Sequence, residues 1–189
     1  NNVYNVGNTI VDAYEYVIKN IPIPLNIKTI IDKNKDYIII TLHRRENKGE
    51  NIIKMWNELN DISLKYKSIK LFYIKHPSLE DVTSYLNKNI ILLEPQDYIS
   101  MVYLISNCKG IISDSGGLQE EATCAKKKIL ICRNTTERPE TIENNYGKLV
   151  NTDIINNINF LFENNSFTKT NPYGSNVCSK IINIIKNET

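Results

Sequence analysis

The sequence is poor in glycine and almost neutral, and it lacks the features that mark several classes of protein. It holds 7 glycines and a formal net charge of +2 in 189 residues. So small a charge creates no global field that would attract nucleic acid or an anionic membrane. No apolar run approaches the length needed to span a membrane, and no signal peptide is visible. We therefore expect a cytoplasmic protein without nucleic-acid or membrane partners.

The usual cofactor and nucleophile signatures are also missing. The four cysteines have no metal-ligand spacing, and we expect them to be reduced thiols, mostly buried. The sequence contains neither a Walker motif nor a complete GxGxxG fingerprint, and no Ser-His-Asp or Cys-His arrangement can be assigned. We expect no metal and no other cofactor. Since the chain begins with Asn1 rather than Met, we expect it to be part of something longer.

Apolar runs of strand length alternate with segments of helical periodicity. With 41% hydrophobic and 23% charged residues, the chain is typical of one globular domain. This alternation predicts right-handed βαβ units and a doubly wound, Rossmann-like parallel sheet of the α/β class. The expected strands are residues 3–9, 37–42, 69–74, 90–93, 110–113, 129–132 and 148–150. The expected helices are residues 10–19, 51–65, 79–86, 97–106, 118–125, 153–163 and 175–186.

Two helices carry a clear apolar face. In the first, we expect Thr9 to cap the amino end and a shared face to be buried, made of Ile10, Ala13, Tyr14 and Val17. In the segment 51–65, the positions at helical spacing are core rather than a cofactor site: Ile52, Met55, Trp56, Leu59 and Ile62.

The chemically rich loops all follow predicted strands. They are residues 43–47, 75–76, 113–117 and 133–140. In a doubly wound sheet, ligands bind beyond the carboxyl ends of the strands, so these four loops are expected to share one edge. The sequence therefore predicts a polar binding site at this edge.

The turn Ser115-Gly116-Gly117 is the strongest anion-binding signal. Glycines before a helix let backbone N–H groups and the positive helix dipole approach an oxygen-rich ligand such as a diphosphate. A tight strand-to-helix turn without a ligand is an equally good explanation of this motif alone.

The charged side chains near this turn each allow two interpretations. His43, Arg44 and Arg45 suit phosphate recognition, or they belong to an ion-pair network with Glu46 or Glu50. His76 either contacts the ligand or is a hydrogen-bonded structural histidine.

The helix after the turn and the loop at 133–140 raise similar alternatives. Glu120 or Glu121 could accept hydrogen bonds from ribose, or both could form a solvated face beside the helix dipole. Arg138, held extended before Pro139, could rim the site or form only a local salt bridge. Three side chains either contact a nucleobase or pack in the core: Tyr98, Met101 and Tyr103.

Taken together, these segments resemble the non-hydrolysing UDP-N-acetylglucosamine 2-epimerase family. The resemblance is carried in order by residues 5–9 (NVGNT), 43–47 (HRREN), 94–98 (EPQDY), 114–121 (DSGGLQEE), 133–140 (RNTTERPE) and 171–174 (NPYG). It covers nearly the whole chain, but only the second half of the family's architecture.

The resemblance implies the second Rossmann-like half of a GT-B fold. Residues 1–189 would form a single UDP-binding domain, with 1–24 as inter-domain crossover and linker and 175–189 as a terminal helix. The implied reaction interconverts UDP-GlcNAc and UDP-ManNAc by elimination of UDP and its re-addition. The implied partners are the UDP-sugar, a missing N-terminal domain in cis or trans, and a second copy in a homodimer.

The resemblance also assigns roles by position. His43 and Arg138 would serve catalysis. Ser115, Gly116, Gly117, Glu121 and Met101 would bind UDP, although Met101 stands where some relatives carry Phe. Arg44 and His76 match positions that touch an additional, allosteric UDP-GlcNAc. The family's acid/base carboxylates belong to the missing half.

The leading hypothesis is therefore the UDP-binding half of an epimerase, inactive without its N-terminal half. The alternative is a stand-alone UDP-sugar-binding or regulatory module without catalysis. A third hypothesis is another GT-B enzyme that uses UDP-sugars.

Overall fold

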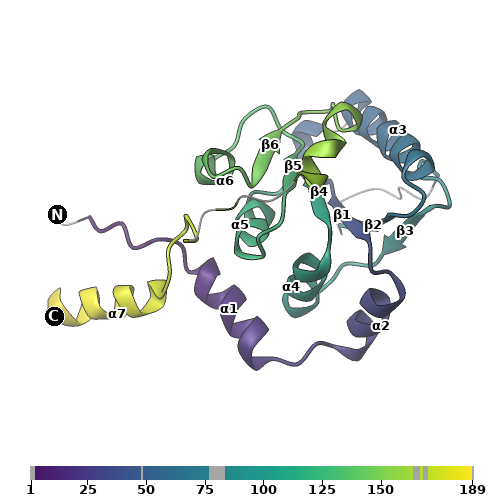
Figure 1. The fold of residues 1–189 in the computed structure, drawn as a ribbon. Helices are drawn as coiled ribbons and strands as arrows, with labels where there is room; N and C mark the ends of the chain where they lie inside the picture. The colour runs from purple at the N-terminus through teal and green to yellow at the C-terminus, as the bar shows by residue number, and fades with distance from the viewer. Residues whose placement is uncertain (1–2, 48, 77–83, 164–166, 168–169, 189) are drawn as a thin grey trace.

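A six-stranded parallel sheet forms the centre of the computed structural model, which describes residues 3–47, 49–76, 84–163, 167 and 170–188 (Figure 1). The strand order is β3-β2-β1-β4-β5-β6, and each neighbouring pair is parallel. This confirms the doubly wound sheet. The strands are β1 (Tyr37–Thr41), β2 (Lys70–Ile74), β3 (Ile90–Leu93), β4 (Gly110–Ser113), β5 (Ile129–Ile131) and β6 (Gly147–Leu149).

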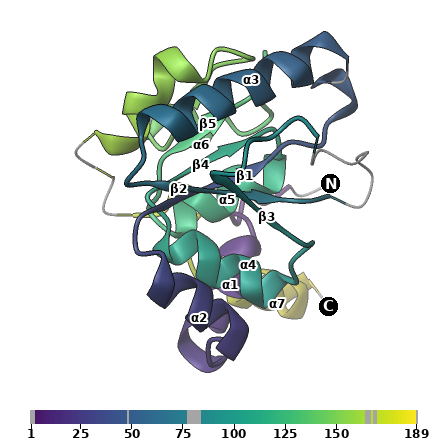
Figure 2. The same ribbon diagram turned by 90° about the vertical axis from the view of Figure 1, so that its right-hand side faces the viewer.

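Helices cover both faces of the sheet (Figure 2). One face carries α3 (Glu50–Lys65) and the 3-10 helix η2 (Ile155–Phe162). The other carries α2 (Leu25–Lys33), α4 (Tyr98–Asn107) and α5 (Gly116–Cys124), with α1 (Ile10–Asn20) packed against α4 and α5. The remaining elements are η1 (Arg45–Asn47), α6 (Pro139–Glu143) and α7 (Val177–Glu188).

The apolar run at β1 forms the middle of the core. All five of its residues are buried, as expected for a central parallel strand covered on both faces. Ile38 and Ile40 pack toward α3, whereas Tyr37 and Ile39 pack toward α2 and α4. The predicted apolar stripe of α3 is buried as well, which confirms it as core.

The order of the strands places a topological switch point between β1 and β4. From β1 the chain adds β2 and then β3 on one side; β4, β5 and β6 extend the sheet on the other. The connections that leave β1 and β4 therefore diverge to opposite sides, and a crevice opens between them beyond the carboxyl ends. The loops 43–47 and 114–117 begin at this point.

Several expectations about local structure were wrong. Residues 3–8 form no strand, and the side chain that accepts the Ile10 N–H at the start of α1 belongs to Asn8 rather than Thr9, at 3.0 Å. Tyr14 and Val17 are buried as expected, but the third buried position is Val11, whereas Ile10 is half-buried and Ala13 exposed, because the face that α1 turns toward α4 and α5 is rotated slightly from the expected one.

Other differences concern the type and presence of elements. Residues 155–162 wind as a 3-10 helix rather than an α-helix, and the sequence analysis had missed the short helices α2 and α6. Of the helix expected at 79–86, residues 79–83 lie outside the described residues, and 84–86 form a turn. Within the described ranges, no helix is long and apolar enough to cross a membrane.

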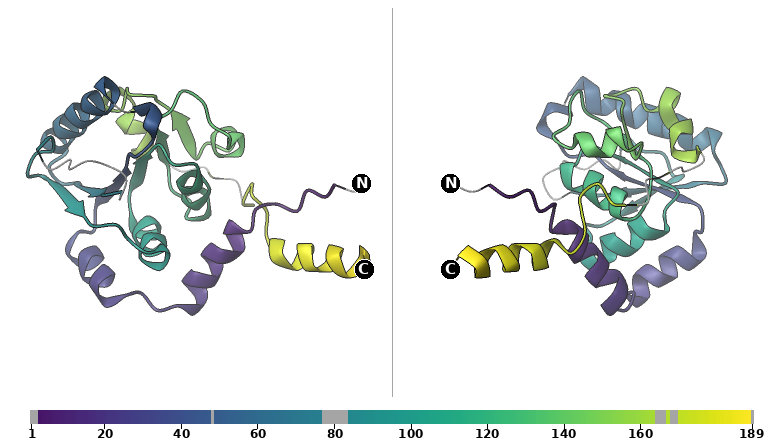
Figure 3. Two further views of the ribbon diagram at one scale, coloured as in Figure 1. Left: turned by 180° about the vertical axis from the view of Figure 1, so that it is seen from behind. Right: turned by 60° about the vertical axis from the view of Figure 1, so that its left-hand side comes forward.

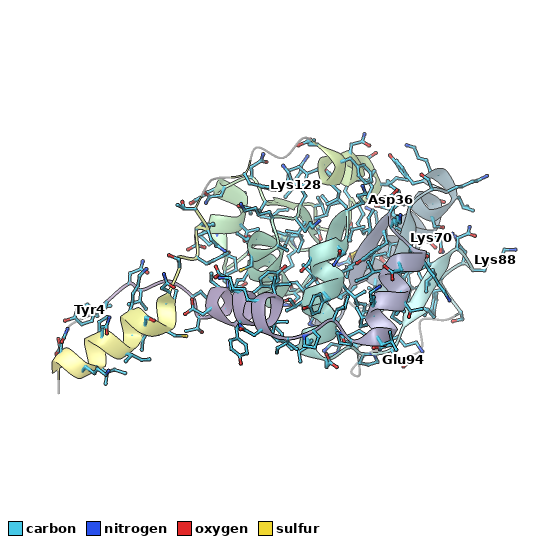
Figure 4. The ribbon with its side chains drawn as sticks, turned by 60° about the horizontal axis from the view of Figure 1, so that its bottom comes forward. Tyr4, Asp36, Lys70, Lys88, Glu94 and Lys128 are labelled. Atoms are coloured by element: carbon cyan, nitrogen blue, oxygen red, sulfur yellow. The ribbon has the colours of Figure 1, made fainter. Side chains whose placement is uncertain are left out.

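The end of the sheet at which the strands begin, opposite the switch point, is rich in lysine. Figure 4 shows Lys70 and Lys88, each close to the amino end of a strand, with Lys128 on the same side of the molecule. Helices α2 and α3 run back toward this end and carry Lys33 and Lys65 in their last turns. Lys33 and Lys65 offset the negative ends of their own helix dipoles, and Lys128 packs over the Phe160 ring at 4.2 Å.

The two ends of the chain meet beside the sheet and leave it together (Figures 1 and 3). The N–H of Asn8 donates to the carbonyl oxygen of Tyr173 at 2.9 Å. Gly7 has a φ of +98°, and a Cβ at this position would lie 2.4 Å from the same carbonyl oxygen. Only glycine fits, so the pairing of segments 5–9 and 171–174 depends on Gly7.

We expect Gly7→Ala to lower the free energy of unfolding by about 1–3 kcal/mol, because the new Cβ adds backbone strain and a clash with Tyr173. Urea denaturation followed by circular dichroism measures the change. Gly117→Ala is the matched control, since nothing lies within 4 Å of a Cβ there. Equal stability of the two variants would contradict the proposed role of Gly7.

Candidate functional site

A cavity of about 400 Å³ opens at the switch point, beyond the carboxyl ends of β1 to β4. It collects side chains from four loops that are distant in sequence. The lining residues are Thr41, His43, Ile74, Lys75, His76, Pro95, Gln96, Met101, Ser115 and Leu118. Of the residues predicted to bind a ligand, the cavity thus brings together His43, His76, Met101 and Ser115.

The carboxylate of Asp114 organises one wall of this cavity. It is fully buried at the end of β4 and accepts hydrogen bonds from the backbone N–H groups of His43, at 3.0 and 3.1 Å, and Arg44, at 2.8 Å. The side-chain amide of Asn47 donates to it at 2.8 Å and to the Cys132 carbonyl oxygen at 3.1 Å. Burial alone would raise the pKa of Asp114, but these hydrogen bonds outweigh burial and hold the pKa below its ordinary value.

The two histidines of the chain stack on each other at the cavity. The ring centroids of His43 and His76 are 4.4 Å apart, with an angle of 13° between the planes. Burial and, second, the neighbouring His43 lower the pKa of His76. Positive charge at this point is therefore favoured on one imidazole at a time.

Helix α5 begins at the cavity with two glycines that the fold does not require. Ser115 caps the helix through its side-chain oxygen, which accepts the Leu118 N–H at 3.5 Å. Neither Gly116 nor Gly117 has a positive φ. A Cβ on Gly117 would meet nothing within 4 Å, and one on Gly116 would meet only Arg44 Nη2, at 3.9 Å. The helix start is thus open for a close ligand, with a guanidinium beside it.

The loop at 133–140 is tied to α5 by Gln119 and Glu120. Gln119 is fully buried; its amide donates to the Ser115 carbonyl oxygen at 3.2 Å and accepts from the Thr136 hydroxyl at 2.6 Å. Glu120, also buried, accepts a hydrogen bond from Nε of Arg138. Glu120 is therefore a buried, ion-paired carboxylate rather than a solvated one.

Arg133 braces the same loop from the end of β5. Its guanidinium makes a bidentate pair with Glu137, at 2.6 and 2.8 Å, and a third contact with Glu46 at 3.2 Å. Glu46 thus forms an ion pair with Arg133 at the end of β5; the side chain of Arg45 lies outside the described residues.

Glu121 lies one residue further along α5, outside the lining of the cavity. Burial and, second, the charge of Glu120 raise the pKa of Glu121 to about 7. The ionised Glu121 in turn contributes, after burial, to a raised pKa of Tyr98 at the start of α4. The position offers a partly buried acceptor between α4 and α5.

The structure separates the predicted site residues into two groups. Arg44, Gly116 and Gly117 adjoin the cavity, whereas Glu121 and Arg138 stand apart from it on α5 and in the loop at 133–140. Sequence reasoning had assigned no role to the buried polar side chains that join the loops: Asp114, Asn47 and Gln119. The only sequence signal was that Asp114 and Gln119 flank the Ser-Gly-Gly turn. Among the described residues, no group of three or more His, Cys, Asp or Glu side chains could hold a metal ion.

The strand order and the polar cavity at the switch point define a Rossmann-like α/β domain with a ligand site at its strand ends. The comparisons with known proteins make this more specific. The family model for UDP-N-acetylglucosamine 2-epimerase matches residues 1–186, and the chain belongs to this family. Its structural neighbours are GT-B enzymes, which confirms the expected fold.

Individual relatives agree. The chain is 33% identical over 208 residues to a UDP-N-acetylglucosamine 2-epimerase of Yersinia pestis, covering 99% of this chain and 55% of that protein. It is 36% identical over 210 residues to one of Campylobacter jejuni, covering 97% and 54%. The crystal structure of the Neisseria meningitidis enzyme bound to UDP-GlcNAc superposes with a TM-score of 0.81 and 32% identity, covering 97% and 55%. The chain therefore spans about half the length of the relatives it matches.

The raised pKa of Glu121 predicts a pH-dependent stability. In the window from its ordinary value of 4.5 to about 7, the folded state binds more protons than the unfolded state, so stability falls as pH rises. We expect the wild type to lose up to about 3 kcal/mol relative to Glu121→Gln between pH 4 and pH 8.

Urea denaturation of both proteins at the two pH values measures this difference. The contributions of all other carboxylates to the pH dependence of stability are common to both proteins and cancel in the comparison. A parallel pH dependence of the wild type and the variant would show that Glu121 titrates at its ordinary pKa.

Proposed function

We propose that this chain is the UDP-binding half of a UDP-GlcNAc 2-epimerase, formed as a single domain over residues 1–189. Residues 1–24 serve as crossover and linker, and 175–189 as the terminal helix. The observation that carries the proposal is the open amino end of α5, where Gly116 and Gly117 are required neither by packing nor by φ. Backbone N–H groups and a helix dipole at such a point suit a diphosphate.

In this proposal the site holds UDP along α5. Ser115, Gly116 and Gly117 bind the diphosphate, Glu121 accepts hydrogen bonds from the ribose hydroxyls, and Met101 lies beside the base. Arg44 and His76 contact an additional UDP-GlcNAc that acts as an activator.

The chemistry assigned to this chain is stabilisation of the departing UDP. Elimination breaks the bond between C1 of the sugar and the diphosphate and removes the C2 proton, which leaves 2-acetamidoglucal. Re-addition then bonds the UDP oxygen to C1 again and returns a proton to C2 with the opposite configuration, which completes the epimerisation. Negative charge grows on the diphosphate as it leaves, and a protonated His43 and the start of α5 stabilise it. Arg138, ion-paired with Glu120, is assigned a catalytic role at the charged rim of the cleft between the two halves.

The groups that move the C2 proton are assigned to a preceding N-terminal half, supplied in cis or trans, and the complete enzyme to a homodimer. Apolar side chains on the two chain ends support such a partner. Val3 is 94% exposed, and Ile182 and Ile185 on α7 are 50% and 57% exposed. These segments project from the body of the domain (Figures 1 and 3).

The alternative is a stand-alone UDP-sugar-binding or regulatory module without catalysis. In that case a UDP-sugar binds at the cavity of the switch point and is sensed without being converted.

We expect the purified chain to bind UDP, and His43→Ala and Gly116→Val each to weaken binding about 10-fold or more. The first removes a charged partner, and the second fills the space that the diphosphate needs. Isothermal titration calorimetry measures the affinities. Lys70→Ala, at the opposite edge of the sheet, is the control. Unchanged affinity in both site variants would refute the assignment.

We also expect the chain by itself to convert no UDP-GlcNAc to UDP-ManNAc, as followed by proton NMR of the sugar anomeric signals. Addition of a separately expressed N-terminal half should restore conversion if the chain is half of an enzyme. Conversion by the chain alone would contradict the assignment of the groups that move the C2 proton to the N-terminal half. UDP binding without restored conversion would favour the binding module.

A further inference from the structure

The buried Asp114 carboxylate reaches the imidazole of His43 as well as its backbone. Nδ1 of His43 lies 3.2 Å from Oδ1 of Asp114. Nδ1 is itself buried, and its approach to Oδ1 is a close ion-pair contact that lacks hydrogen-bond geometry, whereas the side chain as a whole retains 27% of its exposure and lines the cavity. The rest of the ring, including the Nε2 edge, is therefore the part that can face a ligand.

The chemistry of the pair determines where a hydrogen must sit. An ionised carboxylate only accepts hydrogen bonds, so a nitrogen held against it is favoured when it carries a hydrogen. Asp114 stays ionised because Arg44, Asn47 and the His43 backbone all donate to it. Nδ1 of His43 is therefore expected to keep its hydrogen in both the neutral and the charged imidazole, and Nε2 becomes the nitrogen that gains or loses a proton.

The two imidazoles share the electrostatic surroundings of Asp114. His76 stacks on His43 from the end of β2, and the charge of Asp114 acts on His76 as well, whereas the Asp114 carboxylate lies directly against Nδ1 of His43. The other charged groups at this edge are Lys75, which pairs with Glu94 at 2.7 Å, and Arg44 beside the start of α5. Two adjacent imidazolium rings would repel each other, so the stacked pair favours one positive charge at a time.

We propose that Asp114 is the positioning residue for His43: it holds a hydrogen on Nδ1, presents Nε2 to the cavity, and fixes the loop that carries the imidazole. The inference rests on the proposed function, in which His43 faces the departing diphosphate. When protonated at Nε2, His43 donates a hydrogen bond to a diphosphate oxygen as negative charge grows there during elimination. During re-addition the negative charge on the diphosphate decreases and this hydrogen bond weakens. No proton is consumed in this cycle.

The chain offers a clean test because it contains only two histidines. NMR of the histidine ring carbons and nitrogens reports which nitrogen carries the hydrogen, and His76→Asn assigns the two sets of signals. Without any ligand, we expect neutral His43 of the wild type to be the Nδ1–H tautomer. In Asp114→Asn, we expect a shift toward the Nε2–H tautomer that free histidine prefers, together with UDP affinity reduced about 10-fold or more.

Asp36→Asn is the matched control. It makes the same chemical change at an exposed ion pair with Lys109, before β1 rather than beyond its carboxyl end, and should alter neither the tautomer nor the affinity. Should Asp114→Asn fail to fold, the wild-type tautomer still decides. A dominant Nε2–H form of His43 in the wild type, or an unchanged tautomer in a folded Asp114→Asn, would overturn the positioning role. An Nδ1–H tautomer in a wild type that does not bind UDP would refute the proposed function while supporting the positioning.

Discussion

The candidate site depends on one buried charge, the carboxylate of Asp114. A carboxylate that is fully removed from water is tolerated only when donors surround it. Here those donors come from the loop after β1, through the backbone N–H groups of His43 and Arg44 and the side chain of Asn47. The loop that brings His43 to the cavity therefore takes its shape from a residue about seventy positions away in the sequence.

The same short segment also holds the second loop of the site. Residues 114–121 supply Gln119 to Thr136 and Glu120 to Arg138, on the other side of α5. The three motifs at 43–47, 114–121 and 133–140 are thus parts of one hydrogen-bonded unit. Between the two braced loops lies the open start of α5, where neither packing nor backbone conformation requires glycine. Rigid walls around such an opening keep a binding geometry prepared before a ligand arrives.

The sheet explains why these parts meet. The switch point between β1 and β4 brings the ends of two strands together while their connections diverge, and the loops of β2 and β5 follow at the neighbouring positions. At the other end of the domain, Gly7 allows the two chain ends to touch at Tyr173, so the segments at 5–9 and 171–174 also belong together. Motifs from both ends of the sequence therefore have direct structural partners.

The sequence by itself determined the class of fold, because buried parallel strands are continuous apolar runs and helices show their own period. The six strands of the sheet and the apolar stripe of α3 were predicted for this reason. The sequence also identified three of the loops that reach the cavity, at 43–47, 75–76 and 113–117, since polar groups at strand ends share one edge; the loop after β3, with Pro95 and Gln96, was not among the predicted ones, and no residue of 133–140 lines the cavity.

Only the tertiary structure decided which polar groups are paired with one another across distant loops. Glu120 and Glu121 are adjacent and chemically identical, yet one is paired with Arg138 and the other has its pKa raised by burial. Asp114, Asn47 and Gln119 give no local signal of their roles, because a hydrogen bond between distant segments depends on packing. In α1, Tyr14 and Val17 are buried as the sequence pattern predicted, but contact with α4 and α5 buries Val11 in place of Ala13.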